Sequence, residues 1–156
     1  MQKKLETITN FLKVSENLAT AGQPTPGQFN AIKKAGYQVV INLALTDSPG
    51  ALLDETSLVV RLGMAYYHIP VIWEKPDPKD LQRFFEMMDQ EKEKKIFVHC
   101  MLNFRATAFV YLYSIIRLGE PPEAPAEMMR QVWEPDETWQ AFIDSMLRAG
   151  RSGISI

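Results

Sequence analysis

Residues 95–107 read KIFVHCMLNFRAT, and the pattern within this stretch decides how the chain is expected to fold. Lys95 to Val98 is a short apolar run of the kind that forms a buried strand. The residues from Phe104 to Leu118 are apolar on nearly every face, which predicts a buried helix. Cys100 therefore lies in a short loop between a strand and a helix.

The rest of the chain also alternates between strands and helices. Further strands are expected at 37–43 and 65–71, and further helices at 26–35, 54–62, 78–88 and 135–147. Thr25 and Asp77 each precede a proline, which predicts a helix N-cap followed by proline at the first helical position.

Residues 120–125 hold three prolines and read as a break within the domain, with the C-terminal helices lying within 123–148. This order predicts one α/β domain over 1–156, with a mostly parallel central sheet flanked by helices.

Composition and charge narrow the class of protein. The chain has 156 residues, of which 46% are hydrophobic and 23% charged, with a net charge of −2. This balance is typical of a globular domain and gives no electrostatic reason to expect binding to nucleic acid or to a membrane surface. No apolar run approaches the roughly 20 residues that span a bilayer, so we expect a cytoplasmic location.

One cysteine and two histidines limit the chemistry of the chain. A single thiol can form no intramolecular disulfide, and no CxxC pair is present. His68 and His99 together with Cys100 are too few and too scattered for a zinc site. We therefore expect neither a metal nor an organic cofactor.

Cys100 falls at the carboxyl end of a strand, the edge at which sheets of this kind bind ligands. The N-terminal amides of the next helix point back toward this edge, and loop N–H groups can surround an anion. These amides and Arg105 favour the thiolate form of Cys100. Arg105 also offers a planar fork that can hold two oxygens of a phosphate. The expected phosphate-binding residues are Met101, Leu102, Asn103, Phe104 and Arg105.

Supporting roles are expected for three neighbours of Cys100. His99 should orient or polarise the loop from behind, and Thr107 should donate a hydroxyl hydrogen bond to the thiolate. Asn103 is the loop residue best able to adopt a positive φ, because the loop has no glycine. The competing interpretation is an inert buried cysteine, a common fate of lone cysteines. The strand–loop–helix context favours the functional interpretation.

Motifs outside the loop support the same interpretation. Residues 21–26 read AGQPTP, residues 39–43 read VVINL and residues 66–71 read YYHIPV. With the loop, they resemble the cysteine-dependent protein phosphatases of the dual-specificity-like kind found in bacteria, over roughly residues 14–118. The resemblance implies a phosphatase-like α/β fold and the hydrolysis of phosphomonoesters through a phosphocysteine intermediate. It implies that Cys100 is the nucleophile and Arg105 the phosphate clamp, and that the partner is a phosphorylated substrate of unspecified class.

The resemblance also implies an acid that protonates the leaving group, on the loop after Val71. Glu74 and Asp77 are the carboxylates of this loop. Asp77 has an alternative duty as a helix cap, whereas Glu74 has none and lies closer to the strand end. We therefore favour Glu74 over Asp77 as the general acid.

The length of the loop leaves two further functions open. Four residues separate Cys100 from Arg105, where the phosphatase loop usually has five. Four is also the spacing in the persulfide loop of rhodanese sulfurtransferases, so a sulfurtransferase that uses a Cys100 persulfide is one alternative. The other is a module that binds phosphate without turning it over. The sequence assigns no oligomeric state.

Overall fold

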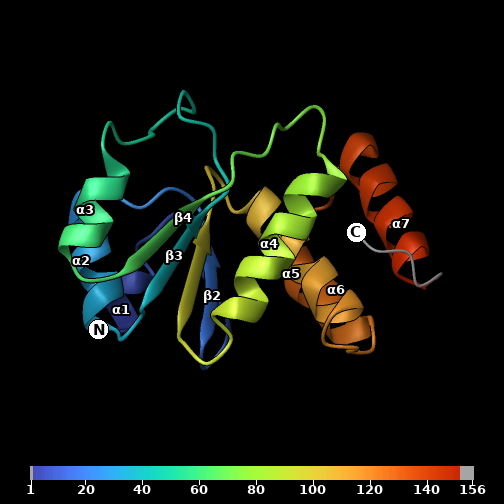
Figure 1. The fold of residues 1–156 in the computed structure, drawn as a ribbon, viewed down its shortest axis with the longest axis horizontal. Helices are drawn as coiled ribbons and strands as arrows, with labels where there is room; N and C mark the ends of the chain where they lie inside the picture. The colour runs from blue at the N-terminus through green and yellow to red at the C-terminus, as the bar shows by residue number, and fades with distance from the viewer. Residues whose placement is uncertain (1, 152–156) are drawn as a thin grey trace.

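The computed structural model describes residues 2–151, which form a five-stranded sheet between two groups of helices (Figure 1). The strands are β1 (Leu12–Ser15), β2 (Leu18–Ala21), β3 (Val39–Asn42), β4 (Ala65–His68) and β5 (Ile96–His99). Their order in the sheet is β1-β2-β5-β3-β4, and all neighbours are parallel except the antiparallel pair β1 and β2. The expected α/β domain with a mostly parallel sheet is confirmed.

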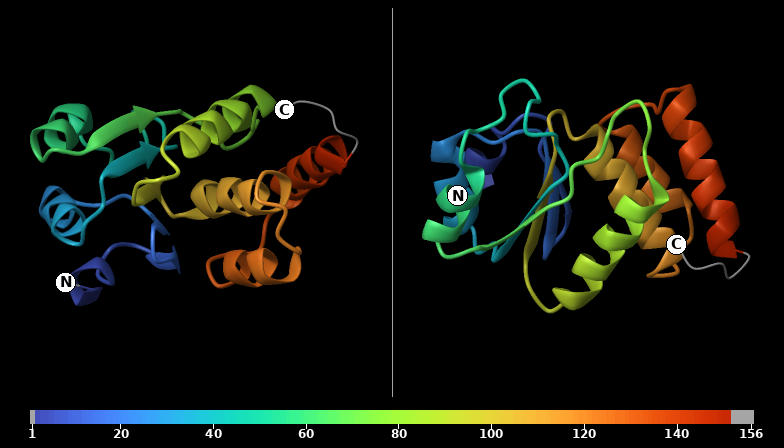
Figure 2. Two further views of the ribbon diagram at one scale, coloured as in Figure 1. Left: turned by 60° about the horizontal axis from the view of Figure 1, so that its bottom comes forward. Right: turned by 45° about the horizontal axis from the view of Figure 1, so that its top comes forward.

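Helices cover both faces of the sheet (Figures 1 and 2). One group is α1 (Gln2–Leu5), α2 (Pro26–Lys34) and α3 (Glu55–Arg61); the other is α4 (Pro78–Gln90), α5 (Phe104–Ile116), α6 (Glu123–Arg130) and α7 (Glu137–Arg151). Successive strand residues point to opposite faces, so Ile41 and Val98 join the core beneath α4, α5 and α7. Val40 and Phe97 join the core beneath α2 and α3. Two apolar cores thus hold the sheet from both sides.

The α5 helix is the central support of the larger core. Every residue from Arg105 to Ser114 is buried, and the helix contacts α4, α6, α7 and β2. This agrees with the sequence, in which the helix is apolar on nearly every face. Because α5 is enclosed, its N-terminus has a fixed position at the carboxyl edge of the sheet.

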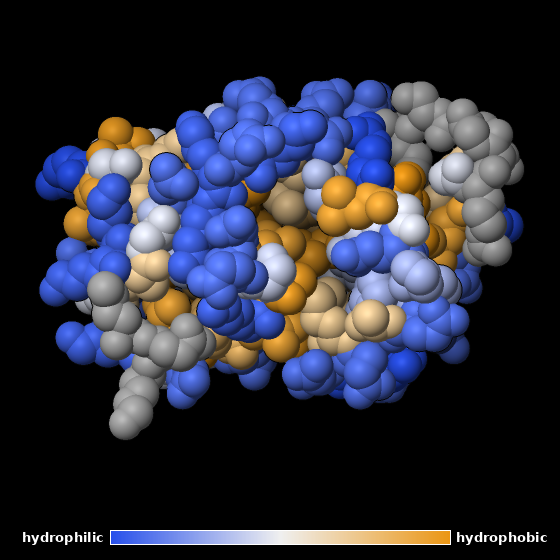
Figure 3. Space-filling view, turned by 90° about the horizontal axis from the view of Figure 1, so that it is seen from below, coloured by the Kyte–Doolittle hydropathy of each residue, from blue (hydrophilic) through white to orange (hydrophobic). Residues whose placement is uncertain are grey.

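The opposite edge of the sheet presents a mainly hydrophilic surface with an apolar hollow near its middle (Figure 3).

Local signals for helix starts are confirmed. Thr25 caps α2 through a capping box with Gln28, and Asp77 caps α4 by accepting from the backbone N–H of Lys79 at 2.9 Å. Pro26 and Pro78 occupy the first helical turns as expected.

The observed elements differ from the expected ones in several places. The strand expected at 65–71 ends at His68, because Pro70 has no N–H to donate, although Ile69 and Val71 still donate to β3 and the residue after it. The C-terminal helices begin at Glu123 as expected, with Pro125 tolerated in the first turn of α6, but α7 runs to Arg151, beyond the expected end at 148. The β1–β2 hairpin has no counterpart in the expected elements.

No helix within residues 2–151 is both long enough and apolar enough to cross a membrane.

Candidate active site

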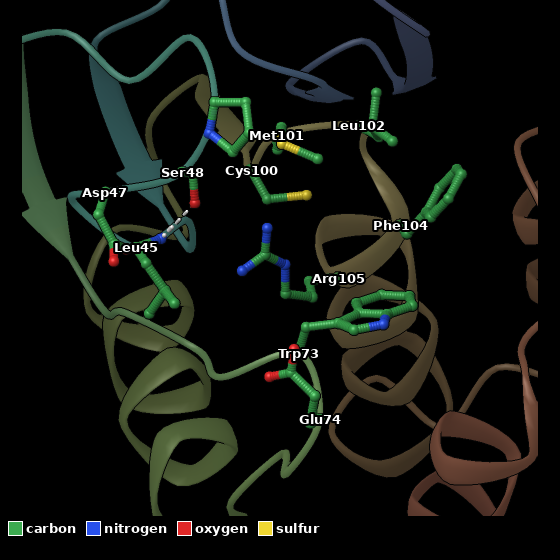
Figure 4. Close-up of a pocket in the computed structure, with 11 residues that line it drawn as sticks. Leu45, Asp47, Ser48, Trp73, Glu74, Cys100, Met101, Leu102, Phe104 and Arg105 are labelled. Carbon is green, nitrogen blue, oxygen red and sulfur yellow. Dashed lines mark hydrogen bonds between the residues drawn. The ribbon is translucent and has the colours of Figure 1, made fainter.

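A cavity of about 440 Å³ opens at the carboxyl edge of the sheet, where the sequence places Cys100. Three loops supply its walls: the β3–α3 loop, the β4–α4 loop and the β5–α5 loop (Figure 4). The lining residues are Leu45, Asp47, Ser48, Pro49, Trp73, Glu74, Cys100, Met101, Leu102, Phe104 and Arg105. Arg105 is the one cationic side chain among them.

Cys100 and Arg105 meet in this cavity. Cys100 follows β5 directly, is 1% exposed, and its N–H donates to the carbonyl of Ala21 at 3.2 Å. Arg105 lies in the first turn of α5, and its Nη1 donates to the carbonyl oxygen of Val71 at 2.8 Å. The other N–H groups of this guanidinium have no partner within residues 2–151. In Figure 4 the Cys100 thiol and the guanidinium point into the same space.

The first three carbonyl groups of the loop are bonded away from the cavity. The oxygen of Cys100 faces Nδ1 of His99, that of Met101 accepts from Gln23 N at 2.9 Å, and that of Leu102 accepts from Asn10 Nδ2 at 2.9 Å. No peptide bond in the described chain is cis, so each N–H points opposite to the carbonyl of its own peptide group. The N–H groups of Met101 and Leu102, which follow the first two of these carbonyls, therefore point to the other side of the loop, an arrangement that can surround an anion.

Two backbone positions allow the loop to take this shape. Asn103 has φ 75° and is confirmed as the left-handed residue; its Nδ2 donates to the carbonyl of Asn10 at 2.7 Å. Gly22 lies so close to the loop that a Cβ there would collide with the oxygen of Met101. This collision explains why a glycine follows Ala21.

His99 is fully buried behind the loop. Its Nδ1 lies 3.1 Å from the carbonyl oxygen of Cys100 and its Nε2 lies 2.7 Å from Oε2 of Glu55. This is the position expected for a residue that orients the loop; its role in catalysis stays a prediction.

Glu55 is a residue of the site that the sequence interpretation missed. It is 6% exposed and also accepts from Nε2 of Gln23 at 2.8 Å. Burial by itself raises the pKa of Glu55, but hydrogen bonds from His99, Gln23 and Tyr66 and the charge of His99 outweigh burial and lower it. The sequence holds one indication that Glu55 is buried: it lies four residues before Val59 and so shares the buried face of α3.

Thr107 requires a correction. Its hydroxyl donates back to the carbonyl oxygens of Asn103 at 2.8 Å and Phe104 at 3.1 Å, and accepts from Nε1 of Trp133 at 3.1 Å. A helical threonine commonly bonds to the carbonyl four residues before it, and this uses the single hydroxyl proton. Thr107 therefore does not donate to the thiol but fixes the first turn of α5.

The two carboxylates of the β4–α4 loop occupy different places. Glu74 is exposed and lines the cavity, on the side opposite Cys100 in Figure 4. Asp77 is the N-cap of α4 and is not among the lining residues. Asp47, on the β3–α3 loop, is a further lining carboxylate that the sequence interpretation did not single out.

Trp73 forms one wall of the cavity, here called the Trp73 wall, and other aromatic residues support it. Nε1 of Trp139 donates to the carbonyl oxygen of Trp73 at 2.9 Å, and the two rings are 5.6 Å apart. Phe104 stacks on Trp133 with ring centroids 4.8 Å apart. The C-terminal part of the chain therefore supports both aromatic walls of the site.

Solved structures with the same architecture are phosphatases. PTPMT1 in complex with PI(5)P superposes with a TM-score of 0.78 and 11% identity, covering 92% of this chain and 97% of that chain. TpbA of P. aeruginosa gives 0.69 and 18%, covering 92% and 91%. At these identities the likeness establishes the fold, which is that of the protein-tyrosine-phosphatase-like enzymes.

A nearer relative identifies the family. The protein of Shewanella putrefaciens CN-32 described as "Putative phosphatase (DUF442)" has a TM-score of 0.85 and is 36% identical, covering 95% of this chain and 97% of that chain. The chain belongs to the DUF442 family, the family of that protein.

Curated relatives are longer proteins. The "Beta-lactamase hydrolase-like protein" of Xylella fastidiosa (strain Temecula1) is 30% identical over 110 residues, which is 68% of this chain and 25% of that protein. The protein of the same description from Agrobacterium fabrum is 30% identical over 104 residues. The chain thus spans about a quarter of the length of these relatives. No family model matches the chain.

Proposed function

We propose that the protein hydrolyses phosphomonoesters through a phosphocysteine intermediate on Cys100. The observation that carries the proposal is the meeting of Cys100 and Arg105 in one cavity, beside a loop whose first three carbonyls are bonded outward. The phosphatase fold and the family relationship support the same reaction.

The reaction has two displacements. The Cys100 thiolate attacks phosphorus in line, so the S–P bond forms and the bond to the leaving oxygen breaks, while Glu74 gives a proton to that oxygen. Water then attacks phosphorus, the S–P bond breaks, and Glu74 takes a proton from the water. Arg105 and the loop amides stabilise the equatorial oxygens in both steps.

Replacement of the nucleophile tests the proposal. Cys100→Ser should abolish hydrolysis of p-nitrophenyl phosphate, while orthovanadate still binds to the unchanged loop. Retained hydrolysis in this variant contradicts the mechanism. A wild-type protein that binds vanadate but hydrolyses no aryl phosphate would instead be a phosphate-binding module.

The loop length leaves a second candidate open, a sulfurtransferase, although the fold and the family relationship do not favour it. The loop holds four residues between Cys100 and Arg105, and apolar side chains such as Met101 and Leu102 line the cavity around the thiol. In this reaction the thiolate attacks the outer sulfur of thiosulfate, sulfite leaves with the electron pair of the broken S–S bond, and a persulfide remains on Cys100. Mass spectrometry after incubation with thiosulfate would then show about 32 Da added, the mass of one sulfur atom. An unmodified Cys100 would exclude this candidate.

A further inference from the structure

The two ring nitrogens of His99 both face hydrogen-bond acceptors. Nε2 lies 2.7 Å from the carboxylate of Glu55, and Nδ1 lies 3.1 Å from the backbone oxygen of Cys100. A neutral imidazole carries one N–H and can donate to only one of them. The ring has no solvent exposure, so water cannot supply the missing donor. Both contacts are satisfied when the ring carries two protons and forms an ion pair with Glu55.

The surroundings of Glu55 favour its charged form. Its Oε1 accepts from Gln23 at 2.8 Å, and Tyr66 also bonds to the carboxylate. Three donors on one buried carboxylate compensate for its removal from water. Tyr66, on β4, is the other titratable group that the described residues place against this carboxylate, and burial raises the pKa of its hydroxyl. From α2, the edge of the Phe29 ring packs against the His99 ring, with centroids 5.9 Å apart.

We propose that Glu55 is a positioning residue for Cys100, acting by holding His99 in its doubly protonated form. The proposal rests on the proposed role of Cys100 as nucleophile. A protonated Nδ1 attracts the Cys100 carbonyl to the side away from the cavity, which turns the Met101 N–H toward the anion. The imidazolium then lies between Glu55 and the backbone of Cys100, so its positive charge is on the Cys100 side of the ion pair, and this favours the thiolate.

A neutral ring would act differently. A ring that kept its proton on Nε2, toward Glu55, would present a bare Nδ1 to the carbonyl oxygen of Cys100. Two acceptors 3.1 Å apart repel each other, so the carbonyl would turn and weaken the anion-binding loop. The negative charge of Glu55 disfavours this singly protonated ring, because it stabilises a second proton on the His99 imidazole.

The charge of Glu55 can be removed without removing its hydrogen bonds to Gln23 and His99. In Glu55→Gln the amide oxygen can still accept from Gln23, and the amide NH₂ can donate to Nε2 of a neutral His99. A role limited to packing and hydrogen bonding therefore leaves this variant unaffected, whereas the proposed role does not. Tyr66→Phe is the milder variant, since it removes one donor from Glu55 and leaves the charge. Asp89→Asn is the matched control, because Asp89 bonds Tyr113 and Arg117 away from the cavity.

The first experiment reads the protons on His99 directly. The chain has two histidines, so long-range ¹H–¹⁵N spectra at neutral pH give two sets of ring signals, which a His68→Gln variant assigns. We expect both His99 nitrogens at imidazolium shifts in the wild type, and one unprotonated nitrogen in Glu55→Gln. A singly protonated His99 in the wild type overturns the proposal.

The second experiment reads the thiol. Cys100 is the single cysteine, so alkylation by iodoacetamide followed by mass spectrometry reports this thiolate alone. We expect the half-maximum of the rate–pH profile to move up by about one unit in Glu55→Gln, about a tenfold loss of thiolate at lower pH. The shift should be smaller in Tyr66→Phe and absent in Asp89→Asn. A folded Glu55→Gln protein with the wild-type profile overturns the proposal.

Neither experiment uses a phosphate ester, so a negative result for the role of Glu55 can be told apart from a negative result for phosphatase activity. A protein that hydrolyses nothing can still show the protonated His99 and the shifted profile. Conversely, an active phosphatase in which both measurements are unaffected by Glu55→Gln retains its proposed function and loses this inference.

Discussion

Arg105 Nη1 donates to the carbonyl oxygen of Val71 at 2.8 Å, which joins the start of α5 to the chain segment that leads to Glu74. The side chain is 6% exposed and is therefore oriented before any ligand arrives. An arginine held in this way loses little conformational freedom on binding an anion. One backbone contact thus fixes the guanidinium relative to both the Cys100 loop and the opposite wall.

Arg105→Lys tests how much the fixed, planar guanidinium contributes to catalysis. Lysine keeps the charge but cannot bond Val71 and hold two phosphate oxygens with one planar group. We expect kcat for p-nitrophenyl phosphate to fall by about 10² to 10³, the typical cost of removing a transition-state donor. Steady-state kinetics measure the change, and a decrease of less than about threefold would be inconsistent with a clamp.

Glu74→Gln tests the proposed general acid. The amide cannot protonate a leaving oxygen, so kcat should fall by about 10² or more for phenyl phosphate, whose leaving group needs a proton. The decrease should be much smaller for p-nitrophenyl phosphate, because p-nitrophenolate leaves without one. Rates for the two esters, measured side by side, give the comparison.

Asp77→Asn is the companion variant, because asparagine still caps a helix and the Asp77 side chain is not among those that line the cavity. It should leave the ratio of the two rates unchanged. If Asp77→Asn changes this ratio and Glu74→Gln does not, the assignment of the acid is reversed.

Trp139→Phe tests the support of the Trp73 wall. Phenylalanine keeps an aromatic ring at this fully buried position but removes the 2.9 Å hydrogen bond to the Trp73 carbonyl and leaves part of the indole volume unfilled. We expect a loss of about 2 kcal/mol in the free energy of unfolding, from the hydrogen bond and the cavity together, and a higher KM, because the wall and Glu74 beside it lose a fixed anchor. Denaturant titration and kinetics measure these effects. An unchanged KM would show that the wall is held by packing alone.

The features of this protein that the sequence predicts are those with local causes. Thr25 and Asp77 are recognisable caps because the proline that follows each fixes the start of a helix. Asn103 is recognisable as the left-handed residue because its loop has no glycine. The strand–loop–helix around Cys100 follows from the change of apolar pattern at that point.

The features that the sequence interpretation missed depend on contacts between distant segments. Glu55 lies 44 positions from its partner His99, and an acidic residue at a helix start is ordinarily exposed. Thr107 has one proton, and only the structure shows that nearby carbonyls accept it. The β1–β2 hairpin has few of the β-branched and aromatic residues that mark the other strands, so its sequence gives only a weak strand signal.

Asn103 tests the backbone of the loop. Asn103→Ala places a less tolerant residue at φ 75° and removes the bond from Nδ2 to Asn10, so we expect a loss of about 2 kcal/mol in the free energy of unfolding. Asn103→Gly loses the same bond but accepts the backbone conformation, so its loss should be smaller. Denaturant titrations of both variants rank these costs. Equal losses would mean that the side-chain bond, and not the conformation, dominates.

Glu55 also makes the stability of the fold depend on pH. The pKa of its carboxyl in the folded protein is lowered from an ordinary value of 4.5, in spite of burial, by hydrogen bonds from His99, Gln23 and Tyr66. The folded protein therefore binds a proton at this carboxyl less readily than the unfolded chain does. Its contribution to stability is complete above about pH 4.5 and is lost as the pH falls through the lower, folded-state value.

Denaturant titrations of the wild type between pH 7 and pH 3 should show this loss. The amide that Glu55→Gln introduces does not titrate, so that variant should have a flatter profile below pH 4.5 than the wild type. The Asp89→Asn variant should keep the slope that Glu55 contributes, since Asp89 does not contact the Glu55–His99 pair. Parallel profiles for the wild type and Glu55→Gln would mean that the Glu55 carboxyl has the same proton affinity in the folded and unfolded chains.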